Sequence, residues 1–298
     1  MPAKKTRRLR PASVSINPAR LGMDYQAIVP NWYANNPFLT AAFNALSAQF
    51  PPGERFLIQS ARLFRDQVTD PQLQQDVAGF IGQEAHHAKE HEQLSAALKR
   101  IGVPTDLIER DTQWLLDRIC GLLSEKDQMA ATAALEHFTS MLGSLVLANP
   151  DVMKEVHPSV QPLFIWHAIE ESEHKAVAFD LYQHTVGSYP RLMLAYLWTT
   201  SLLVIVTSYF QLRLMAKDRS LLRLGATAKG LHWMFGFGRN AGHFRRMLPE
   251  LFAFFRPGFH PWEKDNSADI SYWKGVLAQL TETQGKRKSA TQPALSVV

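Results

Sequence analysis

Apolar positions recur at helical spacing along most of the chain, and proline and glycine separate the apolar segments. Leu57, Ala61, Phe64 and Val68 show this spacing in the first expected helix. Alternation of the kind that predicts a strand is not found over any useful length. The pattern predicts helices at residues 54–67, 71–101, 105–122, 125–148, 160–186, 190–216, 220–235, 241–255 and 268–283. We therefore expect an all-α chain whose short connections favour packed antiparallel helices.

Proline, glycine and capping residues set the expected helix ends. The Pro-Pro-Gly sequence at 51–53 precedes the first expected helix, because proline lacks the N–H that a helix interior uses. Ser124 is a predicted N-cap for the helix at 125–148, since a serine hydroxyl accepts an N–H bond of the first turn. The Asn-Pro-Asp sequence at 149–151 ends that helix. The segment 160–186 is expected to form one helix.

Two Glu-x-x-His sequences are the first candidates for chemistry. One runs from Glu84 to His87 and the other from Glu171 to His174. Positions three apart share a helix face, so one carboxylate and one imidazole can bind the same metal ion. A single pair of this kind is more often part of a solvated helix face. The two motifs therefore need a further observation before they indicate a site.

Two further glutamates supply that observation. Glu54 lies in the helix before the first motif, and Glu136 lies in the long helix before the second. Glu136 stands in a nearly uncharged segment, where a carboxylate is costly unless it is paired or binds metal. Glu54 stands at a helix start, where favouring the helix dipole is the alternative explanation. One Glu from each of two helices and one Glu-x-x-His from each of two others can form a dinuclear metal site.

Neighbouring polar residues extend this candidate site. His167 precedes Glu171 by four positions and shares its helix face, as a third histidine ligand or as a core histidine. His91, four after His87, is either an additional ligand or a residue that orients one. Glu170 is a candidate acceptor for a metal-bound imidazole, which usually donates its second N–H. The predicted ligands are Glu54, Glu84, His87, Glu136, His167, Glu171 and His174. No catalytic residue separate from these ligands is expected.

Composition narrows the metal chemistry. The chain has 298 residues, of which 46% are hydrophobic and 20% charged, as in globular proteins. Its single cysteine, Cys120, excludes a disulfide framework and a cysteine-based zinc or iron–sulfur site within one chain. Carboxylate and imidazole ligands without thiolate suit iron or manganese. We expect two iron ions, with manganese or zinc as alternatives.

The net charge of +5 is unevenly distributed. Residues 11–212 contain 21 Asp and Glu against 13 Lys and Arg, whereas residues 213–246 contain eight Lys and Arg and only Asp218 as an acid. The basic segment is either a surface for anionic lipid or an acidic partner, or a set of solvated helix faces. No zinc-finger or RNA-binding signature accompanies it, so a nucleic-acid partner is not expected.

The uncharged segment 192–212 is 21 residues long, which is enough to cross a bilayer. A single span would keep the following basic segment in the cytoplasm and export the acidic body, although no export signal is visible. A buried or dimer-forming helix is therefore favoured, a helix at the membrane surface comes next, and a spanning helix last. The basic N-terminus lacks the apolar stretch of a secretory signal. We expect a cytoplasmic protein, with the inner membrane face as an alternative location reached through residues 192–246.

The expected organisation has four parts. Residues 1–20 form a disordered basic arm, and residues 21–188 form the metal-binding bundle. Residues 189–284 form a helical extension packed on the bundle, and residues 285–298 form a disordered tail. A homodimer is a further expectation, because the apolar extension offers an interface.

The order of four glutamates and two Glu-x-x-His motifs resembles that of the ferritin-like di-iron carboxylate proteins over about residues 50–186. With His167 added, the pattern is similar to that of the di-iron arylamine N-oxygenases related to p-aminobenzoate N-oxygenase. The whole chain also resembles a bacterial family labelled "predicted metal-dependent hydrolase". The first resemblance implies a ferritin-like four-helix bundle that holds two iron ions, with dioxygen and an electron donor as partners.

Three function classes follow. The favoured one is a di-iron oxidase or oxygenase that acts on an apolar small molecule or a lipid. The apolar segment 192–212 and the aromatic-rich segment 231–262 would line a substrate channel, or else belong to the ordinary core. The alternative is a dinuclear hydrolase that uses a metal-activated water. A metal-holding storage or scaffold protein is third, although the roughly 100 residues beyond the bundle are more than a storage cage subunit needs.

Overall fold

The computed structural model describes residues 9–239 and 241–291, and their regular structure is helical. The α-helices are α1 (Pro37–Phe64), α2 (Pro71–Arg100), α3 (Thr105–Cys120), α4 (Glu125–Ala148), α5 (Pro150–Lys154), α6 (Gln161–His174), α7 (Val177–Thr185), α8 (Tyr189–Lys217), α9 (Leu224–Phe235), α10 (His243–Ala253) and α11 (Ser267–Thr291). Short 3₁₀ turns are η1 (Arg65–Gln67), η2 (Ser220–Leu222) and η3 (Pro261–Glu263). The prediction of an all-α chain is confirmed.

Helix α1 begins at Pro37 instead of near residue 54, so the predicted start of the first helix was wrong. Asn36 caps it, because its side-chain oxygen accepts the N–H groups of Phe38 and Leu39 at 2.9 and 3.2 Å. The proline pair at 51–52 lies inside the helix. Each proline leaves a carbonyl one turn earlier without its usual N–H partner. Both prolines are buried against neighbouring helices, and this packing offsets the lost bonds.

The segment predicted as one helix at 160–186 is divided into α6 and α7, so that prediction was also wrong. The break falls at Lys175 and Ala176. The buried Lys175 ammonium donates to the Lys264 carbonyl at 2.7 Å and to the Asn266 side chain at 2.8 Å. It also lies 3.9 Å from the centre of the Trp262 ring. The residues that Lys175 contacts lie about ninety positions farther along the chain. The sequence around residue 175 therefore gave no local signal of the break.

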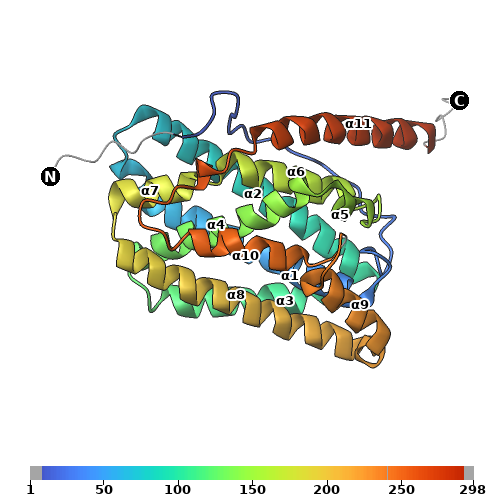
Figure 1. The fold of residues 1–298 in the computed structure, drawn as a ribbon. Coiled ribbons are helices and arrows are strands. Elements are labelled where there is room, and N and C mark those ends of the chain that lie inside the picture. Colours follow the sequence, from blue (N-terminus) through green and yellow to red (C-terminus); the bar gives the residue numbers. More distant parts are fainter. Residues whose placement is uncertain (1–8, 240, 292–298) are drawn as a thin grey trace, which may run out of the picture.

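Four helices surround the predicted ligands. Helix α1 packs on α2 and α4 packs on α6, while contacts of α1 with α4 and of α2 with α6 join the two pairs. Helix α11 covers α6 at the top of Figure 1, and α8 crosses α1 and α4 on the opposite side. Helix α10 lies against α4 and α9. The ligands therefore lie in the interior, between helices that are covered on two sides.

Residues 9–20 contact α2 closely. A Cβ on Gly79 would lie 2.7 Å from the Ile16 carbonyl oxygen, and one on Gly82 would lie 2.4 Å from the Pro18 ring. Glycine at these two helix positions therefore permits the approach of the N-terminal segment. Of the segments predicted to be disordered, residues 1–8 and 292–298 lie outside the described residues, and residues 285–291 continue α11. The boundaries predicted at residues 20 and 188 stay predictions.

Helix α8 is the one helix in the described ranges that is long and apolar enough to cross a membrane by length and composition. Only 22% of its most apolar window is buried. It contacts the bundle near its two ends, through Leu192 and Tyr196 and through Phe210 and Leu214, whereas none of residues 200–209 is buried. The middle of α8 is therefore not packed as a core helix would be, and its surroundings in the cell stay a prediction.

Candidate metal centre

The seven predicted ligands meet in the interior. Helix α1 supplies Glu54, α2 supplies Glu84 and His87, α4 supplies Glu136, and α6 supplies His167, Glu171 and His174. All seven side chains are buried. Helical spacing aligns the members within α2 and within α6, and the packing of the four helices brings the sets together. The structure thus assembles the whole predicted set, while metal binding by it stays a prediction.

The donor atoms fall into two adjacent groups. The first contains Glu54, His87 and His167, and the second contains Glu84, Glu136, Glu171 and His174; within each group one donor atom per residue lies within 4.8 Å of the others. His87 Nδ1 is 3.5 Å from Glu84 Oε1, and His167 Nε2 is 3.0 Å from Glu171 Oε1. Each of these two contacts joins one group to the other. The arrangement therefore fits two neighbouring ions better than one.

The second group is centred on His174. Its Nε2 atom lies 3.2 Å from Glu84 Oε1, 3.2 Å from Glu136 Oε2 and 3.6 Å from Glu171 Oε2. Three carboxylates from three helices thus approach one imidazole nitrogen in a fully buried space. One imidazole proton can serve only one of them well, so the group is suited to a shared cation.

The hydrogen bonding of the buried polar atoms indicates whether the site fits metal ions. Among the described residues, both carboxylate oxygens of Glu54 are buried without a hydrogen-bond partner. The oxygens of Glu84 and Glu136 make no well-aligned hydrogen bond, although one of each lies 3.2 Å from His174 Nε2. Buried polar atoms are almost always satisfied, and buried charges are paired or coordinate metals. Four ionised glutamates would carry four negative charges, which two divalent cations would balance. The donor set therefore fits two divalent ions.

The carboxyl pKa values reflect the cost of burying several negative charges together. Burial raises the pKa of Glu136 to about 8, and the neighbouring Glu171 and Glu84 charges add to the shift. Burial and the Glu84 charge likewise raise the pKa of Glu54 well above its usual value. Burial also disfavours ionised Glu171, but hydrogen bonds from His167 and His174 outweigh it and hold the Glu171 pKa well below its usual value. Ionised Glu54 and Glu136 therefore need a compensating positive charge nearby.

A chain of side chains that the sequence analysis missed supports His174. Gln83 Oε1 lies 3.0 Å from His174 Nδ1, and Gln83 Nε2 donates to Glu173 Oε2 at 2.9 Å. Lys274 of α11 forms an ion pair with Glu173. Gln83 directly precedes the first Glu-x-x-His motif and Glu173 lies inside the second, but no spacing rule singles them out. Their role is to fix the ring orientation of His174.

His91 and Glu170 lie where groups that orient a ligand would lie. His91 Nε2 is 2.7 Å from His167 Nδ1, and His91 Nδ1 is 2.8 Å from Ser47 Oγ. Both ring nitrogens of His91 are therefore engaged by side chains, and the one that meets His167 contacts the ring nitrogen that does not face Glu171. Glu170 Oε2 is 3.2 Å from His87 Nε2. These positions favour the orienting role for both residues over the role of an additional ligand.

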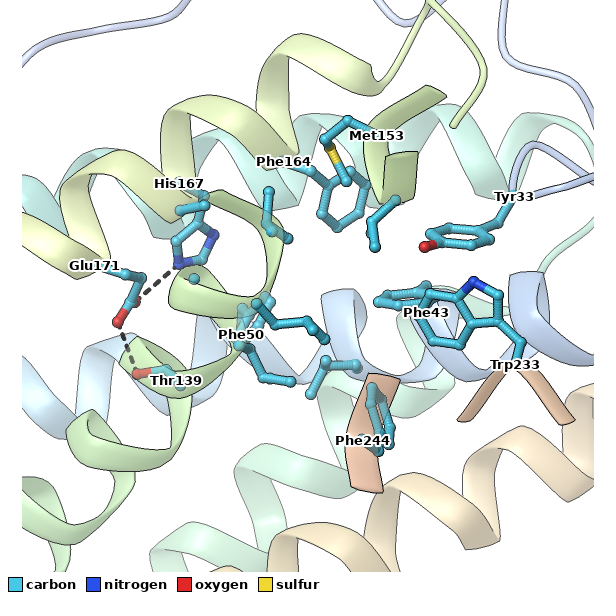
Figure 2. Close-up of a pocket in the computed structure, with 17 residues that line it drawn as sticks. Tyr33, Phe43, Phe50, Thr139, Met153, Phe164, His167, Glu171, Trp233 and Phe244 are labelled. Atoms are coloured by element: carbon cyan, nitrogen blue, oxygen red, sulfur yellow. Dashed lines mark hydrogen bonds and ion pairs between the residues drawn. The ribbon is translucent and has the colours of Figure 1, made fainter. Parts of the chain in front are cut away.

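Close packing of α4 on α6 fixes Glu171. Thr139 Oγ1 donates to Glu171 Oε2 at 2.7 Å, a contact that Figure 2 shows beside His167. One turn farther along α4, a Cβ on Gly143 would lie 3.2 Å from Glu171 Cβ and 3.1 Å from the Ala168 carbonyl oxygen. Glycine at this position permits the approach that places Thr139 within reach of the carboxylate.

An apolar cavity of about 60 Å³ adjoins the centre. His167, Glu171 and Thr139 lie at one end of it, and Tyr33, Phe43 and Trp233 gather at the other (Figure 2). Most of the remaining lining is aliphatic or aromatic. The centre is therefore open on one side to a space that suits an apolar molecule.

Replacement of Gln83 by leucine is expected to weaken metal binding about 10- to 100-fold, because His174 loses the acceptor that orients it. Competition with a metal chelator measures this change in affinity. The same substitution at Gln93, a half-buried position on the same helix away from both donor groups, is expected to leave the affinity unchanged. Equal affinity for the Gln83→Leu variant and the wild type would show that Gln83 does not position His174.

Comparison with known proteins places the chain in a family. A family model described as "Predicted metal-dependent hydrolase" matches residues 18–265. The match covers most of the 298 residues, so the chain belongs to this family. No curated protein and no solved structure matches the chain. The family's description names metal-dependent hydrolysis and supports the hydrolase alternative more directly than the oxidase interpretation.

Proposed function

We propose that this member of the family of predicted metal-dependent hydrolases is a dinuclear metal enzyme. The observation that carries the proposal is the set of four carboxylates and three imidazoles that four helices bring together in a buried space. Both carboxylate oxygens of Glu54 are buried there without a hydrogen-bond partner, and Glu84 and Glu136 make no well-aligned hydrogen bond. Two divalent ions held by this set would meet that need without thiolate ligands.

We propose oxygen-dependent oxidation of an apolar substrate as the first candidate reaction. Carboxylate and imidazole donors suit iron, and the apolar cavity beside His167 and Glu171 suits dioxygen and an uncharged substrate. Bound iron would supply oxygen chemistry in which one oxygen atom enters the substrate and the other leaves as water, with two electrons and two protons from an external donor. The proposed cofactor is therefore a pair of iron ions, with manganese or zinc as alternatives.

The chain's own residues perform three tasks in this reaction. His167 and Glu171 form the end wall of the cavity, so a substrate that fills the cavity lies against the centre. The hydroxyl of Thr139 holds the Glu171 carboxylate in place. The apolar lining excludes bulk water, which strengthens the electrostatic interactions at the centre and limits side reactions.

Hydrolysis is the second candidate, and the family's description favours it. Two metal ions can bind and activate a water, which then serves as the nucleophile without a serine or cysteine. The same cavity would select an apolar ester in place of an oxidisable chain. Both reactions use one metal centre, so the distinction lies in the metal and in the need for oxygen.

Metal analysis followed by an oxygen test separates the two reactions. We expect about two iron ions per chain and oxygen uptake when the reduced protein meets air, with an optical change during uptake. Zinc- or manganese-loaded protein that cleaves an aryl ester without oxygen would instead establish the hydrolase. A purified protein that binds none of these metals would contradict the dinuclear centre.

A further inference from the structure

A second and larger apolar cavity opens beside α8. Its volume is about 360 Å³, within the range of small-molecule sites. Phe38 of α1 and Met141 of α4 contribute its floor, while Leu203 of α8 and Met247 of α10 contribute its walls. The cavity lies where the middle of α8 is not buried against the bundle. It is not part of either donor group.

The two cavities share one wall. Phe43, Leu46, Leu142 and Phe244 line both of them. All four are apolar and only half-buried, so rotation of their side chains can open or narrow a passage between the cavities. The larger cavity therefore leads through an apolar wall to the space that ends at His167 and Glu171.

Exposed apolar side chains surround the outer end of this path. Val204, Leu231, Phe235 and Leu248 line the larger cavity and are also exposed. Leu222 and Phe237, which follow α8 and α9 in the chain, are 81% and 77% exposed. The four that line the cavity lie together, and exposed apolar groups gathered in this way mark an interaction site. We name the surface formed by α8, η2, α9 and α10 the apolar face.

Basic side chains accompany the apolar face. The segment 213–246, which contains η2, α9 and the start of α10, has eight Lys and Arg and one acid. Arg219, Arg223, Lys229 and Arg239 are all exposed. Basic residues near an anionic bilayer are attracted to its surface, and the attraction grows with their number. Leucine and phenylalanine at headgroup depth with a basic surround are typical of proteins that lie on a membrane.

We propose that the apolar face docks on an anionic lipid bilayer and that the larger cavity takes up an acyl chain from it. The charge of the 213–246 segment selects an anionic bilayer as the occupant, and the shared wall directs the chain end toward His167 and Glu171. The fate of the acyl chain rests on the proposed function. Docking and chain uptake themselves require no reaction.

Vesicle flotation tests the docking. The metal-loaded protein is expected to float with vesicles that contain phosphatidylglycerol, to bind pure phosphatidylcholine at least about 10-fold less, and to lose binding at high salt. The double variant Leu222→Glu, Phe237→Glu is expected to bind anionic vesicles at least about 10-fold less than the wild type. Tyr272→Glu is the control, because Tyr272 is exposed on α11, on the other side of the bundle (Figure 1).

Two outcomes would overturn the docking proposal. One is equal binding of the double variant and the wild type to anionic vesicles. The other is a lipid-free dimer, detected by sedimentation, that the double variant dissociates, because a second copy would then cover the apolar face. Metal content and oxygen uptake are measured on the same samples. If they stay normal when vesicle binding fails, the proposed function survives and only this inference is lost.

A spin-labelled fatty acid tests chain uptake without turnover. Metal-free wild-type protein is expected to immobilise a label near the methyl end of the chain. Leu142→Trp, which fills the shared wall, should reduce the immobilised fraction at least about 10-fold. Leu46→Trp adds the same bulk from α1 and guards against misfolding of one variant. Leu122→Trp is the control, since Leu122 is 86% exposed and lies outside both cavities. Equal immobilisation by the Leu142, Leu46 and control variants would overturn the uptake site.

Discussion

Replacement of Glu136 by alanine is expected to lower the metal content from about two ions per chain to one or none. Metal-dependent turnover should fall at least about 100-fold, because removing even a residue that orients a ligand costs 10- to 100-fold. Glu136 is fully buried, lies 3.2 Å from His174 Nε2 and has two oxygens without another partner. Elemental analysis and oxygen uptake measure the two losses.

In the metal-free protein, removal of the Glu136 charge should not lower the free energy of unfolding. Burial and neighbouring carboxylates raise the Glu136 pKa to about 8, so this carboxyl is held in an unfavourable place without metal. Glu136→Gln removes the charge at nearly constant volume and is expected to leave the metal-free fold as stable or more stable. When the metal concentration is 100 times the Kd, binding should raise the free energy of unfolding of the wild type by about 2.7 kcal/mol. The increase should be smaller for the Glu136→Gln variant. Thermal unfolding with and without metal measures both changes.

Glu125→Ala is the matched control. Glu125 lies on the same helix but is exposed in its first turn, where its interaction with the helix dipole contributes at most about 1 kcal/mol. This variant should keep full metal content and turnover. If Glu136→Ala behaved in the same way, Glu136 would not be a ligand, and the dinuclear assignment would fall.

Metal removal is expected to leave a protein that becomes less stable as the pH rises from 6.5 to 7.5. Folded Glu136 keeps its proton up to about pH 8, whereas an unfolded glutamate releases it near 4.5. The contribution of this proton to stability is therefore present at low pH and is lost as the pH rises through about 8. Glu54 changes the stability with pH in the same direction, because burial and the Glu84 charge raise its pKa.

The size of this effect is about 1.4 kcal/mol per pH unit for each additional proton that the folded state holds. His91 and His167 oppose it in part near pH 6.5, because burial lowers their folded pKa values while an unfolded histidine still holds part of a proton there. Their opposition fades as the pH approaches 7.5, whereas the loss from the raised carboxyl pKa values continues. Urea unfolding of chelator-treated and metal-loaded protein at pH 6.5 and 7.5 measures the slopes. A metal-free protein whose stability rises over this range would contradict the raised carboxyl pKa values.

Local sequence signals were most successful where a helix has its own start and stop. The predicted helix at 125–148 agrees with α4, because Ser124 supplies a cap and Asn149-Pro150 supplies an end. The same reasoning failed at the proline pair 51–52, where burial against other helices outweighs the lost hydrogen bonds. It also failed at Lys175, whose ammonium is held by groups about ninety residues farther along the chain. Distant contacts decided both cases.

In the candidate site, too, some features follow from local sequence and others depend on the packing of separate helices. Helical spacing alone indicates that Glu84 and His87 share a face, because positions three apart always do. The sequence could not show that Gln83 supports His174 or that Thr139 holds Glu171, since these pairs join different helices. It also could not distinguish whether His91 binds metal or orients His167. Only the distance between two side chains on packed helices resolves that question.

The all-α class, the positions of most helices and the seven residues of metal-binding type can be read from the amino-acid order alone. These properties depend on periodicity, caps and residue type, which act over a few neighbouring positions. The tertiary structure alone decided that the seven side chains meet in two adjacent groups, that an apolar cavity ends at His167 and Glu171, and that the middle of α8 stays unburied beside a second cavity. These properties depend on which helix faces pack together, and residues far apart in the chain fix that packing.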